Sequence, residues 1–371
     1  MVNPELFSYG FETLTRELRT RAWDAAGNRN PALTATAADP LIIDLDATLV
    51  TAHSDKENVA GTYKGGYGFA PFIASVDYGT RKGSGEILAA VLRPGSAGAN
   101  SAADHIRVFH TAAAQLPEEF YDGTGALAGG KVLVRTDSAG ASRKFLWHLH
   151  SLGVQFTTSY TLPFGKTHMI DWISDKEYWQ PALDQSGNDR TDAWVINATD
   201  VIPLTDYPPD TKLFLRTEPL HPGAQPSLLD TDGHRITAFL TNSPRWHGPF
   251  LDARHRARGR CENRIKTLKN TGLGKLPFFD FTANQAWANI AALTFNLVSW
   301  LQLAALPDGH RAKGWDIKRW RYRLFATAGK IITRARRNQL LLPESAPEKD
   351  LLKLLLDNTA RLAKGLVPST G

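Results

Sequence analysis

One carboxylate, that of Glu262, stands among seven basic side chains between residues 254 and 269. On a helix with about 3.6 residues per turn, five positions of this segment share one face: His255, Arg258, Glu262, Lys266 and Lys269. A neighbouring apolar stripe is expected to pack inward: Cys261, Ile265 and Leu268. A lone acid on a basic face suits a metal ligand held beside a phosphate backbone. A solvated helix with i,i+4 charge pairs explains the segment equally well, so acids elsewhere in the chain must decide.

Two predicted strands carry such acids. Asp44 and Asp46 lie two residues apart on one face of the apolar run 41–50, and Asp137 ends the run 131–137. Clustered carboxylate oxygens suit Mg²⁺, with Mn²⁺ as a substitute, and their mutual repulsion without a cation favours a metal site over a stabilising role. Two such ions can activate a water or a 3′-hydroxyl and stabilise the leaving oxygen of an in-line displacement.

The elements that must position these acids are predicted from the spacing of apolar residues. Strands are expected at 41–50, 68–79, 85–95, 131–137 and 154–160, with helices at 99–116 and 142–153. The Gly/Lys turn between the second and third strands predicts an antiparallel meander. The order β-β-β-α-β-α-β is that of the ribonuclease-H-like fold, an α/β fold with a mixed sheet, in which the fourth strand lies beside a central first strand. Asp46 and Asp137 would then be neighbours, and a helix would bring Glu262 back to them.

The whole chain divides into five predicted regions. They are a short helical N-terminal segment (1–40), the first part of the core (41–164), a β-rich insertion (165–245), the returning helices of the core (246–306) and a basic helical C-terminal region (307–371). The long apolar helix at 283–306 is expected to be buried, and 350–366 to form a terminal amphipathic helix.

The charge distribution indicates a partner made of phosphates. The chain has 371 residues and a formal net charge of +6, and the stretch 311–337 alone carries ten basic residues against Asp316. Aromatic side chains interleave with these cations, which favours nucleic acid over a plain solvated face: Trp315, Trp320, Tyr322 and Phe325. DNA contacts are therefore expected from Arg319, Arg321 and Arg323.

Amino-acid composition bears on the cellular compartment of the protein. A single cysteine excludes an internal disulfide and a Cys-rich zinc site, which fits a reducing cytoplasm. The start of the chain lacks the pattern of a signal peptide, and no uninterrupted apolar run reaches the roughly 18 residues of a membrane span, so no membrane partner is expected.

In these residues the chain resembles the DDE transposases of bacterial insertion sequences, in the branch with a Y-x2-R-x3-E-x6-K signature and a β-rich insertion. The matching elements are DLDAT (44–48), RTDSAG (135–140), and Arg258, Glu262 and Lys269 at the signature spacing. The segments 63–74 and 92–104 are also similar to the second and third strand regions of the family, and the resemblance runs from about residue 41 to 340. His255 stands where the family has tyrosine, and the part before residue 40 is short for the family, which suggests a truncated copy.

The resemblance implies residue roles and partners. Asp46, Asp137 and Glu262 would be the catalytic Mg²⁺ ligands, and Arg258 and Lys269 would contact phosphates, with His255 and Lys266 beside them on the DNA-facing side. It favours Asp46 over Asp44 as the ligand, since the family places the ligand just before a small residue and threonine. The implied activity is hydrolysis at transposon ends followed by attack of the freed 3′-hydroxyl on target DNA. The implied partner is double-stranded DNA, on which a homodimer would assemble in the bacterial cytoplasm.

Two alternatives remain at this point. The first strand also fits the D-x-D-x-T motif of haloacid-dehalogenase-type phosphatases, in which Asp44 would be the nucleophile and Asp46 the general acid/base. That class also needs a late acidic pair at a strand end and does not account for the basic clusters. The other alternative is a DNA-binding relic of a transposase that no longer catalyses the reaction.

Overall fold

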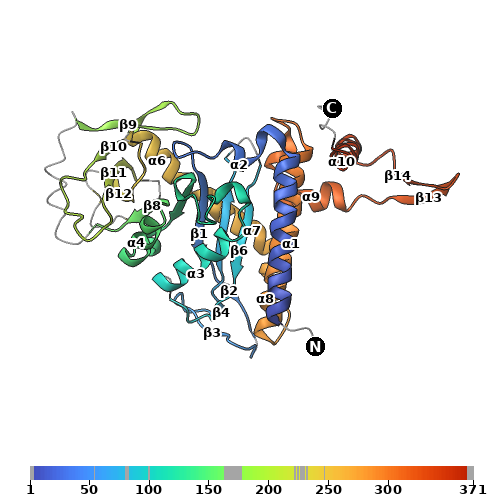
Figure 1. Cartoon of the computed structure of the whole chain (residues 1–371), viewed down its shortest axis with the longest axis horizontal. Coiled ribbons are helices and arrows are strands. Elements are labelled where there is room, and N and C mark those ends of the chain that lie inside the picture. Colours follow the sequence, from blue (N-terminus) through green and yellow to red (C-terminus); the bar gives the residue numbers. More distant parts are fainter. Residues whose placement is uncertain are drawn as a thin grey trace.

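The computed structural model of the protein describes residues 4–53, 55–79, 83–98, 101–162, 178–220, 223, 225, 230, 233–245 and 247–365. One nine-stranded mixed sheet forms its centre (Figure 1). The order across the sheet is β6-β5-β1-β7-β8-β12-β11-β10-β9. In chain order these strands are β1 (Leu41–Ala47), β5 (Phe72–Asp77), β6 (Glu86–Val91), β7 (Val132–Thr136), β8 (Gln155–Tyr160), β9 (Gln180–Leu183), β10 (Asp189–Asn197), β11 (Lys212–Pro219) and β12 (His234–Thr241).

The strand order expected from the sequence is present. β1 is internal, pairs antiparallel with β5 and parallel with β7, and β7 pairs parallel with β8. β5 and β6 form the predicted antiparallel meander. The register of β1 and β7 sets Asp44 opposite Arg135. Asp46 and Asp137, each two residues further along, therefore reach the same edge of the sheet.

The alternation of β1 decides which face carries the acids. Ile43 and Leu45 pack into the core with helices α3 (Ala102–Ala113) and α4 (Arg143–Ser151). Asp44 and Asp46 have the opposite parity, so they face the other side of the sheet. Helices α7 (Gly259–Leu268) and α8 (Phe281–Trp300) cover that side. The predicted apolar stripe is confirmed, because the buried core there contains Cys261, Ile265 and Leu268.

The basic segment 254–269 is not one continuous helix. Helix α6 (Gly248–Arg256) ends at Arg256, with Ala257 as its C-cap, and α7 begins at Gly259. The two helices pack on different parts of the sheet: α6 on β9 and β10, and α7 on β5. The expected single face of five residues is therefore wrong, since His255 belongs to the first helix and Glu262 to the second.

The β-rich insertion extends the core sheet. β12 pairs antiparallel with β8, and β11, β10 and β9 follow outward from it. The predicted boundary at residues 164 and 165 lies outside the described residues. The predicted strand at 68–79 is divided at Ala70–Pro71 into β4 (Tyr67–Phe69) and β5, and β4 joins a small second sheet with β2 (Val50–Thr51) and β3 (Ala60–Gly61).

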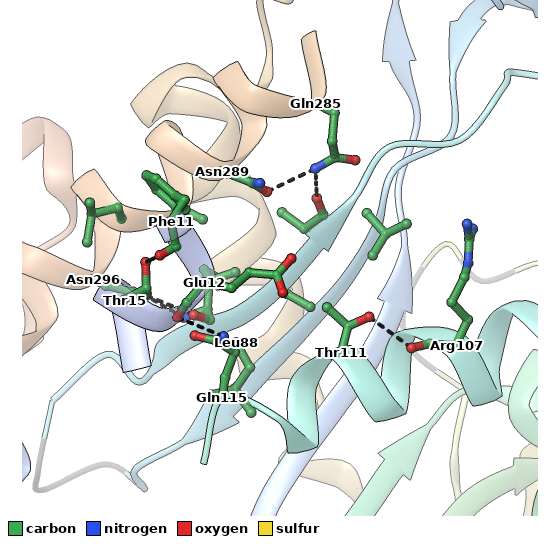
Figure 2. A pocket seen from close by; sticks show the side chains of 16 residues that line it. Phe11, Glu12, Thr15, Leu88, Arg107, Thr111, Gln115, Gln285, Asn289 and Asn296 are labelled. Carbon is green, nitrogen blue, oxygen red and sulfur yellow. Dashed lines mark hydrogen bonds between the residues drawn. The ribbon is translucent and has the colours of Figure 1, made fainter. Parts of the chain in front are cut away.

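The free edge of β6 is covered by side-chain amides. From α8, the Asn296 amide accepts a hydrogen bond from Ile87 N and donates one to Ile87 O, at 2.7 and 2.8 Å. The Gln285 amide accepts a hydrogen bond from Leu92 N and donates one to Ala90 O. Gln285 and Ala90 line a pocket between β6, α3, α8 and α1 (Pro4–Ala25) (Figure 2). Paired in this way, the edge cannot add a strand from another chain. The pocket contains none of the predicted site residues.

The C-terminal part differs from the expected helical region. It contains α9 (Ile317–Trp320), a hairpin of β13 (Lys330–Arg334) and β14 (Arg337–Leu341), and α10 (Lys349–Leu362). The helical prediction is wrong for 330–341, where a run of β-branched residues meets a tight turn. The apolar stretch Phe281–Ala305 is long enough to cross a membrane by length and composition, but 67% of its most apolar window is buried inside the protein, as in a core helix.

Candidate active site

Three predicted carboxylates converge on one guanidinium. Arg258 Nη2 lies 3.1 Å from Asp46 Oδ2 and 3.9 Å from Asp137 Oδ2, and Arg258 Nη1 lies 3.8 Å from Glu262 Oε1. The three acids come from β1, from the end of β7 and from the first turn of α7. Residues more than 200 positions apart in the chain therefore meet around a single cation.

Local structure holds the second acid in place. Asp137 follows β7 directly and caps the short turn Ser138–Gly140, its carboxylate accepting a hydrogen bond from Ala139 N at 3.0 Å. The turn packs so closely on β7 that a Cβ at Gly140 would lie 2.2 Å from Thr136 Oγ1. Thr158 on β8 donates to the carbonyl of Asp137 at 2.7 Å, which ties the turn to the neighbouring strand. The RTDSAG sequence thus specifies a turn that fixes its acid.

The electrostatics of the site favour an added cation. The Asp46 side chain is 15% exposed, and burial raises the pKa of its carboxyl to about 6, with Arg258 acting against the shift and the charges of Asp137 and Glu262 adding to it. Asp137 is 42% exposed and Glu262 is 70% exposed. One guanidinium does not fully compensate the buried carboxylate, and the cluster opens to solvent on the side of Glu262.

The oxygen donors of the three acids suit a hard divalent cation, but they are spaced too widely to hold one in this structure. Among the described residues, no three His, Cys, Asp or Glu side chains lie close enough together to hold a metal ion. The predicted ligands Asp46, Asp137 and Glu262 supply only oxygen donors, which is the set that Mg²⁺ and Mn²⁺ prefer. Arg258 stands between them, and its Nε is buried without a hydrogen-bond partner. The three acids therefore have the donor chemistry of a metal site, while Arg258 occupies the space between them.

A buried ion-pair network lies directly beneath the site. Asp44 is fully buried and is bonded by Arg135, at 2.9 Å from Nη2, and by Arg264. Asp77 on β5 binds Arg135 at 2.6 Å and Arg260 at 2.7 Å, and its arginine neighbours hold the pKa of its carboxyl well below its usual range. The network links β1, β5, β7 and α7, so it sets the positions of the elements that carry Asp46, Asp137 and Glu262.

This network separates Asp44 from Asp46. Asp44 is committed to two arginines and has no exposed surface, so it cannot act as the nucleophile that the phosphatase interpretation requires. Sequence reasoning did not identify Asp77, Arg135 or Arg264 as part of the site. A signal was available, since Arg135 is a charged residue inside an otherwise apolar strand, where an ion that is unpaired would be costly.

His255 is buried, and the expectation that it contacts DNA is corrected by its surroundings. Its Nδ1 lies 3.0 Å from Thr157 Oγ1 and its Nε2 lies 3.1 Å from Ser159 Oγ, both on β8. The ring stacks on Phe239 with centroids 4.9 Å apart. Burial, followed by nearby arginines, lowers the pKa of His255 to about 3, so the ring is neutral. It anchors the end of α6, three residues before Arg258, instead of facing solvent.

The two predicted lysines differ in their environment. Lys269 is half-buried and donates from Nζ to the carbonyl of Leu49 at 2.8 Å, and burial together with Lys64 lowers its pKa. Lys266 is exposed and lines a hollow of about 390 Å³ together with Arg260 and Lys313. A second groove, of about 540 Å³, begins at Arg258 and Glu262 and runs along β8, β11 and β12.

The three arginines of the C-terminal part that were predicted to contact DNA lie outside α6 and α7. Arg319 is on α9, and Arg321 and Arg323 lie in the turn Arg321–Phe325 that follows it. Arg319 stacks over the ring of Trp315 at 4.4 Å, while Arg323 lies 3.9 Å from Glu348. Arg319 and Arg321 are exposed, so both could reach a bound polyanion.

No curated protein matches the sequence. Among solved structures, the chain is similar to the piggyBac transposase in a cryo-EM structure of its synaptic complex with hairpin DNA, with a TM-score of 0.39 and 7% identity. The match covers 71% of this chain and 46% of that one, so the chain spans less than half of that protein. A profile of the family described as transposase DDE domain group 1 matches residues 13–364, and the chain belongs to this family.

Proposed function

We propose that this protein is a DNA transposase that cleaves DNA at insertion-sequence ends and transfers the freed 3′-hydroxyl into target DNA, dependent on Mg²⁺. The observation that carries the proposal is the convergence of Asp46, Asp137 and Glu262 on Arg258. Their elements belong to what we propose is a ribonuclease-H-like core, in line with the β6-β5-β1-β7-β8 order.

Asp46, Asp137 and Glu262 would hold the metal ions, with Mn²⁺ as a substitute for Mg²⁺. When bound, the ions would supply positive charge that activates the attacking oxygen and stabilises the leaving oxygen. Arg258 would then be free to exchange its carboxylate partners for a phosphate oxygen of the strand being cut. Its position beside all three acids would place that phosphate at the reacting atoms.

Further cations would continue the DNA path. Lys266 would bind a phosphate at the rim of a hollow that Arg260 and Lys313 also line, those two being paired with Asp77 and Asp308. Lys269, whose ammonium is bound to Leu49 O, would contact a phosphate only from the edge of the site. Arg319, Arg321 and Arg323 would extend the path along the C-terminal part. A homodimer assembled on the DNA, a bacterial insertion-sequence origin and a cytoplasmic setting complete the proposal.

The test is cleavage of duplex DNA bearing the inverted repeats that flank the gene, with and without Mg²⁺. Asp46→Asn, Asp137→Asn and Glu262→Gln are each expected to abolish cleavage while binding of the same DNA persists. Asp200→Asn, at an exposed loop carboxylate, is the matched control and should cleave like the wild type. Wild-type cleavage by all three site variants would refute the site, and binding without cleavage by the unaltered protein would identify a relic.

A further inference from the structure

The β13–β14 hairpin projects from the body of the protein as an isolated two-stranded ribbon (Figure 1). All five residues of β14 are exposed, and four of the five residues of β13 are exposed as well. Ile331 is 72% exposed, and its cross-strand partner Leu340 is 48% exposed. A lone hairpin is at best marginally stable in water, so this ribbon is a candidate for a surface that another molecule covers.

The charge of the ribbon is of one sign. Lys330, Arg334, Arg336 and Arg337 are its ionisable residues, and no acid occurs between Asp316 and Glu344. Within the described part of the chain, none of these four cations forms an ion pair. Arg334 and Arg337 are direct cross-strand partners, and like charges placed opposite each other destabilise a hairpin. An anion that binds the tip would relieve this repulsion.

The turn also departs from what folding alone favours. Ala335 and Arg336 occupy the two loop positions with φ of 49° and 62°, in the left-handed region. Two-residue hairpin loops of this kind favour asparagine and glycine, since other side chains are strained there. Arg336 thus takes a strained backbone conformation at the outermost point of the ribbon, where its side chain adds positive charge.

We propose that the β13–β14 hairpin is a DNA-binding arm that enters a groove of the duplex, with Arg334, Arg336 and Arg337 against its phosphates. A two-stranded ribbon has the width of the major groove. The exposed arginines Arg319 and Arg321 precede the hairpin in the chain and add further positive charge to the C-terminal part. The inference rests on the proposed function, because it assumes that DNA is the partner. It adds the hairpin as a DNA-binding element.

A second copy of the chain is the competing occupant. Pairing two identical ribbons edge to edge or face to face would bring their basic tips into the same region, and such like charges repel. Duplex DNA instead offers phosphates along both walls of a groove. Charge complementarity therefore favours DNA, and dimerisation through the hairpin is an outcome that the experiment must be able to show.

The experiment measures binding of a full-length triple variant, R334Q/R336Q/R337Q, to duplex DNA over a salt series. The slope of log K against log[salt] is expected to become shallower by roughly 0.9 for each lost phosphate contact, up to about 2.7 for three. The matched control is K349Q/K353Q/K364Q, which removes the same charge from exposed positions on and just after α10. Its slope should stay close to that of the wild type.

Further variants separate the possible causes. R334K/R336K/R337K keeps the charge and should retain most of the salt slope, whereas a ribbon that is merely misfolded in the Gln variant would not be rescued in this way. An unchanged slope in the Gln variant, or an equal change in the α10 control, would overturn the proposal. So would loss of a DNA-free dimer in sedimentation velocity without any change in slope, since this would assign the ribbon to a second copy.

The outcome is distinguishable from failure of the proposed function. If the unaltered protein binds no duplex DNA at any salt concentration, the proposed function fails, and the arm fails with it. If the protein binds DNA and cleaves it through Asp46 but the hairpin variant keeps the full salt slope, only the arm fails.

Discussion

Arg258 and Asp46 form the closest of the three ion pairs that Arg258 makes with the predicted metal ligands, with Nη2 and Oδ2 3.1 Å apart. The same guanidinium lies within 4 Å of carboxylate oxygens of Asp137 and Glu262. Arg258 therefore supplies positive charge to three clustered carboxylates. Under the proposed function, a bound cation would replace the guanidinium and release it toward a phosphate.

Removing this guanidinium tests the exchange. In Arg258→Gln, the carboxylates lose their cation, so Mg²⁺ is expected to stabilise the variant more than it stabilises the wild type, seen as a larger rise in Tm on adding the ion. DNA cleavage should fall, because the phosphate ligand is lost. Arg107→Gln, which removes an exposed arginine from a surface pair with Asp104, is the control. An equal rise in Tm for Arg258→Gln and wild type would show that Arg258 does not occupy the cation position.

The raised pKa of Asp46 predicts a pH-dependent stability difference. The pKa of Asp46 is about 6 in the folded protein against 3.8 in the unfolded chain. Burial of the ionised carboxylate therefore costs no folding stability below pH 3.8. The free energy of unfolding falls as the pH rises from 3.8 to 6, and the full loss remains above pH 6. Asparagine cannot ionise. The free energy of unfolding of Asp46→Asn relative to wild type is thus expected to increase by about 2–2.5 kcal/mol between pH 4 and pH 7. Urea unfolding in chelator measures it, and a difference that stays constant with pH would contradict it.

Asp44 is expected to be a stabilising residue and not a catalytic one. Asp44→Asn leaves Arg135 and Arg264 buried with incomplete compensation, which costs on the order of 3–5 kcal/mol of unfolding free energy. Asp206→Asn, in an exposed pair with Arg143, should cost less than about 1 kcal/mol. Hydrolysis of small phosphomonoesters that disappears in Asp44→Asn would revive the phosphatase interpretation.

His255 is expected to act on stability and on the position of α6. His255→Phe keeps an aromatic ring on Phe239 but loses the contacts to Thr157 and Ser159, so the free energy of unfolding should fall by about 1–3 kcal/mol. The salt dependence of DNA binding should not change, because the buried ring is neutral above its pKa of about 3. A shallower salt slope in this variant would place His255 at the DNA after all.

Local sequence determined much of the outcome. The apolar runs and their order predicted the central β1, the neighbouring β7 and the inward stripe of Cys261, Ile265 and Leu268. These features depend on the spacing of residues a few positions apart, which periodicity reports directly. The three acids could be named for the same reason, because each stands at the end of a strand or in a short motif, at a position that the family pattern also marks.

Only the tertiary structure decided the remaining features. Asp44 and Asp46 are equivalent by strand periodicity, and the arginines that bury Asp44 come from β7 and α7, far along the chain. The break after α6 arises because α6 and α7 pack on different strands, which helical periodicity cannot reveal. His255 is buried for the same reason, and the hairpin at 330–341 replaces a helix through a turn that its residues do not favour. Each of these outcomes depends on contacts with residues that are distant in sequence, and local sequence patterns do not predict such contacts.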